Sequence, residues 1–397
     1  MIPEHIRNDI RSFDYLMVIM VVAVAAFGVV MIATFAELQH LIYAGANLPE
    51  NQRNNVIVGF VIMIIMALVN YRFVAKFAIP IYIGAILLLL AAWIIGPDDI
   101  TGTSRWIPLP LPGGNRMSIQ PSELAKIALI VFFAYFWDKQ NVNRFHWLML
   151  FVALAALPVV MVALQPSLSA ALVLASVAVI MLFLGGLYFR YIIAALLLVI
   201  PAGIMVYFDM LRENRLFIHE VLEPHQITRI ETFLYPVPGS DEFFQMERSL
   251  LAMNVGGMNG RGLGYNQVFV IHGHNDFILA VVGEQLGFMG TATLLGVMMF
   301  IILKCFMIAF RAPDALGRLI AGGVAGLLLF QTFVNVAVVT ELLPNTGMPF
   351  PFLSYGGTSM LVHMAAIGMV LNVGLARARA AFKPEEDQNT PLYKNRF

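Results

Sequence analysis

Long apolar runs, separated by shorter polar segments, occupy most of the chain. Each run approaches the roughly 20 residues of a membrane-crossing helix and exceeds the roughly ten alternating residues of a barrel strand. Only helices and closed barrels satisfy their backbone polar groups in lipid. The pattern therefore predicts an all-α polytopic membrane protein with about ten transmembrane helices. They are expected near residues 13–36, 54–71, 77–96, 122–137, 147–164, 168–186, 189–208, 276–308, 318–342 and 356–376.

Composition excludes the two or three soluble domains that 397 residues would otherwise suggest. The chain is 60% apolar and 12% charged, against roughly half and a quarter in soluble domains. Mean hydropathy is +0.81. Net charge is zero and no basic stripe occurs, which argues against nucleic-acid binding. The single cysteine, Cys305, excludes an internal disulfide and a cysteine-based metal site.

The distribution of Lys and Arg predicts the orientation. With the N-terminus in the cytoplasm, fifteen of these residues fall on inside segments and four on short outside segments or just within the adjoining helix. We therefore expect an N-in, C-in protein. The first run is longer than a signal-peptide core and is expected to be retained as a span. Residues 1–382 are expected to form one membrane domain, followed by a disordered cytoplasmic tail at 383–397.

Long polar segments lie on the predicted outer side of the membrane. Residues 97–121 form a loop rich in Pro and Gly, and residues 209–275 form a large extracytoplasmic loop between helices 7 and 8. Loops of this length are uncommon without a function. No convincing internal repeat is present, which weakens the interpretation as an inverted-repeat transporter.

Glu123 and Lys126 are three residues apart in a segment that begins with Pro121, so they share one face of a helix's first turns. Charges at the centre of a span cost about 2.5–3.5 kcal/mol and need partners or a wet cavity. One interpretation is a structural ion pair. The other is a charged wall of an outward-facing substrate groove, to which Arg105 would add a cation suited to phosphate.

Asp276 stands where the long outer loop meets an apolar helix. Two roles fit equally: an N-cap, because Asp is among the best caps, and a general base at an outward-facing cavity. The nearby His272 and His274 are expected to be solvated, and Glu284 to make a structural hydrogen bond.

Two glycine-rich segments stand out. Residues 256–264 lack the Gly-Lys-Ser/Thr of a phosphate loop, so their glycines are expected to serve tight turns. Residues 347–359 place two prolines and three glycines beside a span. Such broken backbone is tolerated at membrane depth only against protein or a water-filled cavity.

Five groups of residues recur in a fixed order along most of the chain: Arg105-Trp106-Ile107 followed by Gln120-Pro121-Ser122-Glu123 and Lys126; Gln165-Pro166-Ser167-Leu168; Arg229-Ile230 to Pro236 with Gly260-x-Gly262-Leu263-Gly264; Asn275-Asp276-Phe277-Ile278 with Gly283-Glu284-Gln285-Leu286-Gly287; and Pro344-x-x-Gly347-x-Pro349-x-Pro351 with Ser354-Tyr355-Gly356-Gly357-Thr358-Ser359. Together they resemble the SEDS family of cell-wall polymerases, which includes RodA, FtsW and SpoVE. Ser167 and Asn275 depart from the family's usual Asp and Thr.

The resemblance implies a peptidoglycan glycosyltransferase that polymerises lipid II. The family's essential acidic residue corresponds to Asp276. Its role would be to deprotonate the 4-hydroxyl of the acceptor GlcNAc, which attacks C1 of the donor MurNAc and expels undecaprenyl pyrophosphate. Substrate contacts are expected from Arg105, Glu123, Lys126, Arg229, Ser354 and Tyr355.

The same resemblance implies a place in the cytoplasmic membrane, an active site on the extracytoplasmic side and a class B penicillin-binding protein as partner. No tightly bound cofactor is expected; a Mg²⁺ or Mn²⁺ ion would be held weakly between carboxylate and pyrophosphate. Two other functions stay open: a flippase for lipid-linked precursors, and a non-catalytic scaffold of the elongation or division machinery. Polymer formation in detergent and the need for Asp276 separate the three. The choice between elongation, division and sporulation is also open.

Overall fold

The computed structural model describes residues 12–38, 47–95, 105–110, 116–165, 167–191, 193, 197, 201, 205, 208–209, 224–235 and 241–381. Its helices are α2 (Tyr15–Leu38), α3 (Leu48–Leu68), α4 (Tyr71–Lys76), α5 (Ala78–Ile95), α6 (Pro121–Lys139), α7 (Phe145–Ala163), α8 (Leu168–Leu184), α11 (Pro224–Leu234), α12 (Asp241–Gly256), α13 (Ile278–Phe310), α14 (Ala315–Val339) and α15 (Gly357–Ala381). A hairpin of β1 (Ile107–Pro110) and β2 (Arg116–Ile119) pairs antiparallel, Ile107 opposite Ile119.

The chain is a mainly helical, multi-pass membrane protein. Seven of the described helices are long and apolar enough to cross a bilayer: α2, α3, α5, α7, α13, α14 and α15. Two more helices, α6 and the shorter α8, fall where spans are predicted, but α6 carries four charged residues and α8 has 17 residues. Most of the predicted span at 189–208 and the tail at 383–397 lie outside the described residues. The count of ten spans and the N-in, C-in orientation therefore stay predictions.

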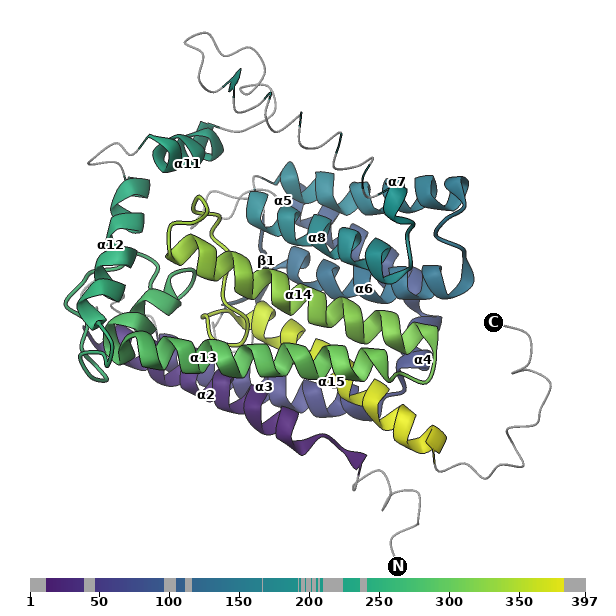
Figure 1. Cartoon of the computed structure of the whole chain (residues 1–397), viewed down its shortest axis with the longest axis horizontal. Coiled ribbons are helices and arrows are strands. Elements are labelled where there is room, and N and C mark those ends of the chain that lie inside the picture. The colour runs from purple at the N-terminus through teal and green to yellow at the C-terminus, as the bar shows by residue number, and fades with distance from the viewer. Residues whose placement is uncertain are drawn as a thin grey trace, which may run out of the picture.

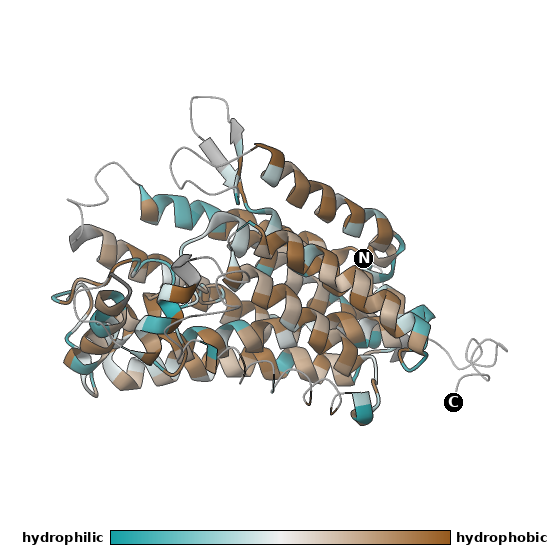
Figure 2. Cartoon of the chain, turned by 90° about the horizontal axis from the view of Figure 1, so that it is seen from above, coloured by the Kyte–Doolittle hydropathy of each residue, from teal (hydrophilic) through white to brown (hydrophobic). Residues whose placement is uncertain are grey.

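Helices α14 and α15 form the centre of the bundle. In their most apolar stretches 72% of the residues are buried, against 22–39% in the other five candidate spans. Figure 1 shows α2, α3, α13, α14 and α15 running side by side along the long axis, with α12 and α4 at opposite ends. Hydrophobic residues follow the bodies of the helices in Figure 2, and hydrophilic ones gather towards the ends. The remaining exposed apolar surface is what a lipid-facing helix requires.

Glycines on α14 allow close approach to its neighbours. A Cβ at Gly323 would lie 2.8 Å from Met181 Sδ of α8 and 2.9 Å from Ile130 Cγ2 of α6. A Cβ at Gly326 would lie 2.6 Å from Ile180 Cγ2. Small residues at such positions are typical of membrane helix interfaces, because they let backbones and larger side chains interlock.

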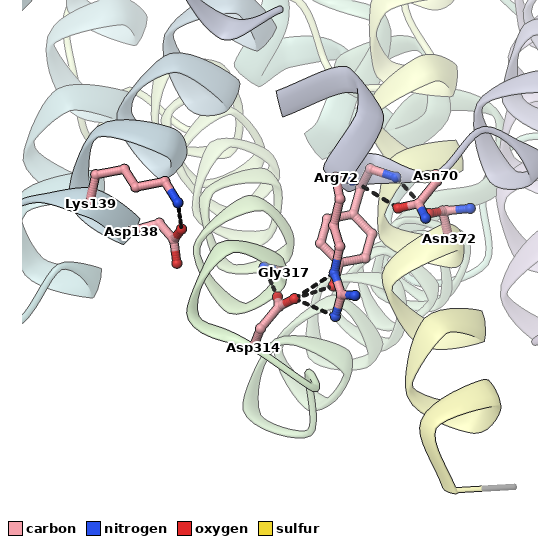
Figure 3. Close-up of polar contacts among 8 residues, drawn as sticks. Asn70, Arg72, Asp138, Lys139, Asp314, Gly317 and Asn372 are labelled. Carbon is pink, nitrogen blue, oxygen red and sulfur yellow. Dashed lines mark hydrogen bonds and ion pairs between the residues drawn. The ribbon is translucent and has the colours of Figure 1, made fainter. Parts of the chain in front are cut away.

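A polar cluster closes the end of the bundle at α4 (Figure 3). Asp314 accepts hydrogen bonds from Tyr71 Oη at 2.8 Å, from Arg72 Nε at 2.8 Å and, as the N-cap of α14, from Gly317 N at 2.8 Å. Tyr71 N donates to Asn372 Oδ1 of α15 at 2.9 Å. One carboxylate thus ties α4 to the start of α14 while capping that helix.

The predicted outer loop at 209–275 contains two helices in its described part, α11 and α12. Helix α12 ends in the glycine-rich segment, which packs on α13 where that helix is kinked at Gly287, φ 65°. A Cβ at Gly256 or Gly260 would collide with the carbonyls of Gly283 or Gln285. Arg261 N donates to Glu284 O at 3.1 Å. These glycines allow the two backbones to approach closely, in addition to forming turns. Backbone N–H groups that a phosphate loop would offer to a ligand instead donate hydrogen bonds to carbonyls of α13.

Candidate active site

Asp276 ends the loop that leads into α13. The N-cap residue of α13 is Phe277, and no side chain makes a capping hydrogen bond there. The structure therefore does not show the capping role that the sequence allowed. Asp276 is half-buried, and its Oδ1 atom has no hydrogen-bond partner among the described residues. A carboxylate oxygen in that state is costly unless a ligand or solvent completes it, so it marks a functional candidate.

Asn335, in the last turns of α14, fixes the backbone beside Asp276. Its Nδ2 atom donates to Asp276 O at 2.8 Å and to Met348 O at 2.7 Å. One buried amide thus holds the loop before α13 against the loop before α15. Asn335 was not among the residues predicted from the sequence, although an Asn inside an apolar helix is a signal of function or of a partner.

Ser354 and Tyr355 hold the same loop from the other side. Ser354 Oγ donates to Asn275 O at 2.7 Å and accepts from Phe350 N at 2.8 Å, and Ser354 is buried. Tyr355 N donates to His274 O at 2.9 Å, and the two rings meet edge to face. Both residues therefore lie against the Asp276 loop. The hydroxyl of Ser354 makes its hydrogen bonds within the protein. Contact of Ser354 and Tyr355 with substrate stays a prediction.

The broken backbone at 347–356 is enclosed by protein. Phe350, Phe352 and Leu353 are buried, and a Cβ at Gly28 of α2 would lie 2.6 Å from Leu353 O. Gln52 Nε2 of α3 donates to Ser354 O at 3.1 Å. This agrees with the requirement that non-helical backbone at membrane depth lie against protein.

Arg229 adjoins Asp276, and Arg105 lies within electrostatic reach of Arg229. A Cβ at Gly347 would lie 3.3 Å from Asp276 Oδ2 and 3.8 Å from Arg229 Nη1, so both groups border one small gap. Arg229 comes from α11 and donates to Asn345 O at 3.4 Å. Arg105 donates from Nε to Gln165 O at 3.1 Å. Burial, and then the nearby Arg229, lower the pKa of Arg105, so the two predicted cations share one region.

Burial sets the protonation of the site. It raises the pKa of Asp276 to about 6, and the charge of Arg229 offsets part of that rise. Burial and then His272 lower the pKa of His274 to about 4, and burial and then Arg229 lower the pKa of His272. At pH 7 Asp276 is therefore mostly ionised while His274 is neutral. A carboxylate with a pKa just below the working pH suits general base catalysis.

Glu123 and Lys126 lie apart from this gap, in the bundle. Lys126 Nζ is 2.6 Å from Glu123 Oε2, and both side chains are nearly fully buried. His363 and Ser359 of α15 adjoin Glu123, and His363 Nε2 pairs with Gln331 Oε1 at 2.7 Å. The structural pair and the substrate wall remain separate hypotheses, and a role in substrate binding stays a prediction.

The face of α6 beside the Glu123–Lys126 pair borders an apolar groove of about 470 Å³. Leu124 and Ile127 of α6 line it together with residues of α3, α5 and α15. Ile119 and Thr358 stand at its β2 side, where Gln120 N donates to Thr358 Oγ1 at 3.2 Å. The groove therefore runs from the bundle towards the hairpin segment that begins next to Arg105.

Glu284 has the predicted structural role: its Oε1 atom accepts from Gln267 N at 2.7 Å and Val268 N at 3.0 Å. Within the part of the chain that the structure describes, no group of three or more His, Cys, Asp or Glu could hold a metal ion. A weakly held Mg²⁺ or Mn²⁺ ion stays a prediction.

Known proteins resemble this chain along most of its length. The family model described as "Cell cycle protein", for FtsW, RodA and SpoVE, matches residues 14–379. The probable peptidoglycan glycosyltransferase FtsW of Geobacter sulfurreducens is 36% identical over 376 residues, covering 92% of this chain and 96% of the relative. The peptidoglycan glycosyltransferase MrdB of Escherichia coli K12 is 30% identical over 338 residues, covering 82% and 85%.

Solved structures share the fold. One, described as "Structural coordination of polymerization and crosslinking by a peptidoglycan synthase complex", matches with a TM-score of 0.74 at 25% identity, covering 92% of this chain and 98% of that chain. The rod-shape-determining protein RodA of Thermus thermophilus matches with a TM-score of 0.63 at 25% identity, covering 94% and 98%. The chain therefore belongs to the SEDS family, the family of FtsW, RodA and SpoVE.

Proposed function

We propose that the chain is a peptidoglycan glycosyltransferase that polymerises lipid II, with Asp276 as its general base. Its relatives are named as peptidoglycan glycosyltransferases, which supports this activity. The assignment of Asp276 as the base rests on one observation. Its carboxylate is half-buried beside Arg229, one oxygen has no hydrogen bond among the described residues, and Asn335 holds the backbone in place. Fixed backbone with an available carboxylate is the arrangement that preorganised catalysis requires.

The proposed step transfers one glycosyl group. Asp276 takes the proton of the acceptor's GlcNAc 4-hydroxyl as that oxygen attacks C1 of the donor MurNAc. The bond from C1 to the pyrophosphate oxygen breaks, and undecaprenyl pyrophosphate leaves with the bonding electrons. Arg105 and Arg229 would stabilise its charge, since guanidinium groups bind phosphate oxygens in pairs. Base catalysis supplies about 10²–10⁴-fold, and charge stabilisation much of the rest.

The apolar groove offers a place for the isoprenoid chain. Its lining is almost entirely hydrocarbon, and it ends beside the hairpin segment near Arg105. A lipid-linked sugar needs this combination: an apolar channel for the tail and cations near the pyrophosphate. We assign the groove to the tail of one lipid-linked substrate.

The proposed location is the cytoplasmic membrane, with Asp276 facing the extracytoplasmic side. The excess of Lys and Arg on the opposite segments supports this orientation. The proposed partner is a class B penicillin-binding protein, because a solved structure with this fold is described as coordinating polymerisation with crosslinking. No cofactor is proposed as tightly bound; a Mg²⁺ or Mn²⁺ ion would enter with the pyrophosphate and share Asp276.

Asp276→Asn tests the proposal in purified protein supplied with labelled lipid II in detergent. Loss of the base should lower the polymerisation rate about 10²–10⁴-fold, while binding of lipid II persists. Asp138→Asn is the matched control, since Asp138 lies near the far end of α6. Polymer of normal length and rate from Asp276→Asn would contradict the assignment. Detergent removes the second leaflet, so polymer formed there cannot come from transport alone.

A further inference from the structure

A second polar pocket lies at the other end of α13, remote from Asp276. It has a volume of about 150 Å³ and lies between the start of α2, the end of α13 and the end of α15. Three cations line it: Lys304, Arg311 and Arg377. Nothing in the proposed transfer of sugars uses them.

The charges of this pocket are not balanced. Lys304 Nζ is 2.8 Å from Asp14 Oδ2, and Asp14 Oδ1 accepts from Met17 N at the start of α2. That pair neutralises itself while joining α13 to α2. The side chains of Arg311 and Arg377 are exposed, and neither makes a hydrogen bond or ion pair with a residue in the described ranges. Within the described ranges the pocket therefore presents about two uncompensated positive charges, and it suits an anion.

An apolar stripe on α13 leads into the pocket. Leu303, Met307 and Phe310 are 52%, 40% and 82% exposed, and Met307 also lines the pocket. Ile308 and Leu371 add apolar wall. In a bilayer this stripe faces acyl chains. The pocket is thus continuous with a hydrocarbon-facing surface, which a free phosphate or an acidic peptide would leave unused.

We propose that this pocket binds the phosphodiester headgroup of an anionic phospholipid in the leaflet opposite Asp276. Arg311 and Arg377 contact its phosphate oxygens, and one acyl chain lies along the stripe formed by Leu303, Met307 and Phe310. Basic pockets between membrane helices recognise anionic headgroups by this combination of charge and apolar contact. The bound lipid bridges α13 and α15 at the ends away from the loops that shape the active site.

Native mass spectrometry of the full chain, purified with phosphatidylglycerol or phosphatidylcholine, tests this site. Arg311→Gln with Arg377→Gln should lower retention of phosphatidylglycerol about 10- to 30-fold, because each interfacial cation contributes about three- to fivefold. Lys76→Gln with Arg318→Gln is the matched control, since both are exposed cations outside the pocket. This control should retain the lipid as the parent does.

Asp14→Asn should act in the opposite direction. Asn caps a helix about as well as Asp, so α2 keeps its start while Lys304 becomes available to the phosphate. Retention of phosphatidylglycerol should therefore rise. Unchanged retention in the Arg311/Arg377 variant, or an equal loss in the Lys76/Arg318 control, would overturn the proposal. So would equal retention of phosphatidylcholine by the parent protein.

Discussion

The Glu123–Lys126 pair on α6 and Asp276 on the loop before α13 are built in opposite ways. At Glu123 and Lys126 a carboxylate meets an ammonium at 2.6 Å, with His363 and Ser359 alongside and almost no exposure. At Asp276 a carboxylate oxygen lacks a hydrogen bond, and Arg229 lies across a gap rather than in contact. Glu123 Oε2 also lacks a hydrogen bond, but the ammonium of Lys126 neutralises its charge in direct contact, and Asp276 has no such contact among the described residues.

The difference separates what holds the bundle from what acts on a substrate. A buried ion pair offsets its own desolvation and is damaged when one partner is removed. A carboxylate left incomplete lowers stability, and it persists where a reaction requires it. This criterion favours Asp276 as the proposed catalytic group, and the pair on α6 is expected to be needed first for folding.

The largest effect is expected from breaking the pair on α6. Lys126→Met leaves a buried, uncompensated Glu123 and should cost about 3–5 kcal/mol of stability. The thermal midpoint and the yield of folded protein in detergent measure this. Glu123→Leu combined with Lys126→Met removes both charges and should regain most of the loss. A single variant as stable as the parent would contradict the pair's role in folding.

The double variant also separates the two hypotheses for the pair. Polymerisation of lipid II by the folded double variant would assign Glu123 and Lys126 to structure alone. A folded but inactive double variant would keep them in substrate binding, as the family resemblance implies.

At Asp276, in contrast, removing the charge is expected to increase the stability of the protein. Because burial raises its folded pKa from 3.8 to about 6, ionisation disfavours the native state. This loss of stability develops as pH rises from about 4 to about 6 and is constant above. Asp276→Asn should therefore raise the free energy of unfolding at pH 7 by on the order of 1–3 kcal/mol. The thermal midpoint should rise with it, and the gain should shrink towards pH 4. A variant less stable than the parent at pH 7 would argue for a structural carboxylate.

The smallest effect concerns Arg229. Its charge lowers the pKa of Asp276, so Arg229→Gln should move the acid limb of the polymerisation rate from about pH 6 to a higher pH. The pH–rate profile at saturating lipid II measures the shift. Arg53→Gln, an exposed arginine paired with Glu50, serves as control. An unshifted limb, with only a lower plateau, would place Arg229 in substrate binding and not in tuning the base.

The order of motifs and the run of apolar segments were sufficient to predict much of the molecule. Nine of the ten predicted spans coincide with helices. Eight of these agree to within a few residues, and the ninth, α3, begins at Leu48 rather than near residue 54. The resemblance of the final motif and of Asn275-Asp276-Phe277 led to the family that the comparisons show. Local sequence carries these features because hydropathy and turn residues act over one helix or loop.

Only the tertiary structure decided what surrounds Asp276. The sequence left cap and base equally open, and it gave no reason to join Asn335 to the carbonyls of Asp276 and Met348 across two loops. It could not show Arg229 at the gap or α13 broken at Gly287 against Gly260. These contacts join segments far apart in the chain, and burial at such junctions, not residue type, sets the pKa of the carboxylate.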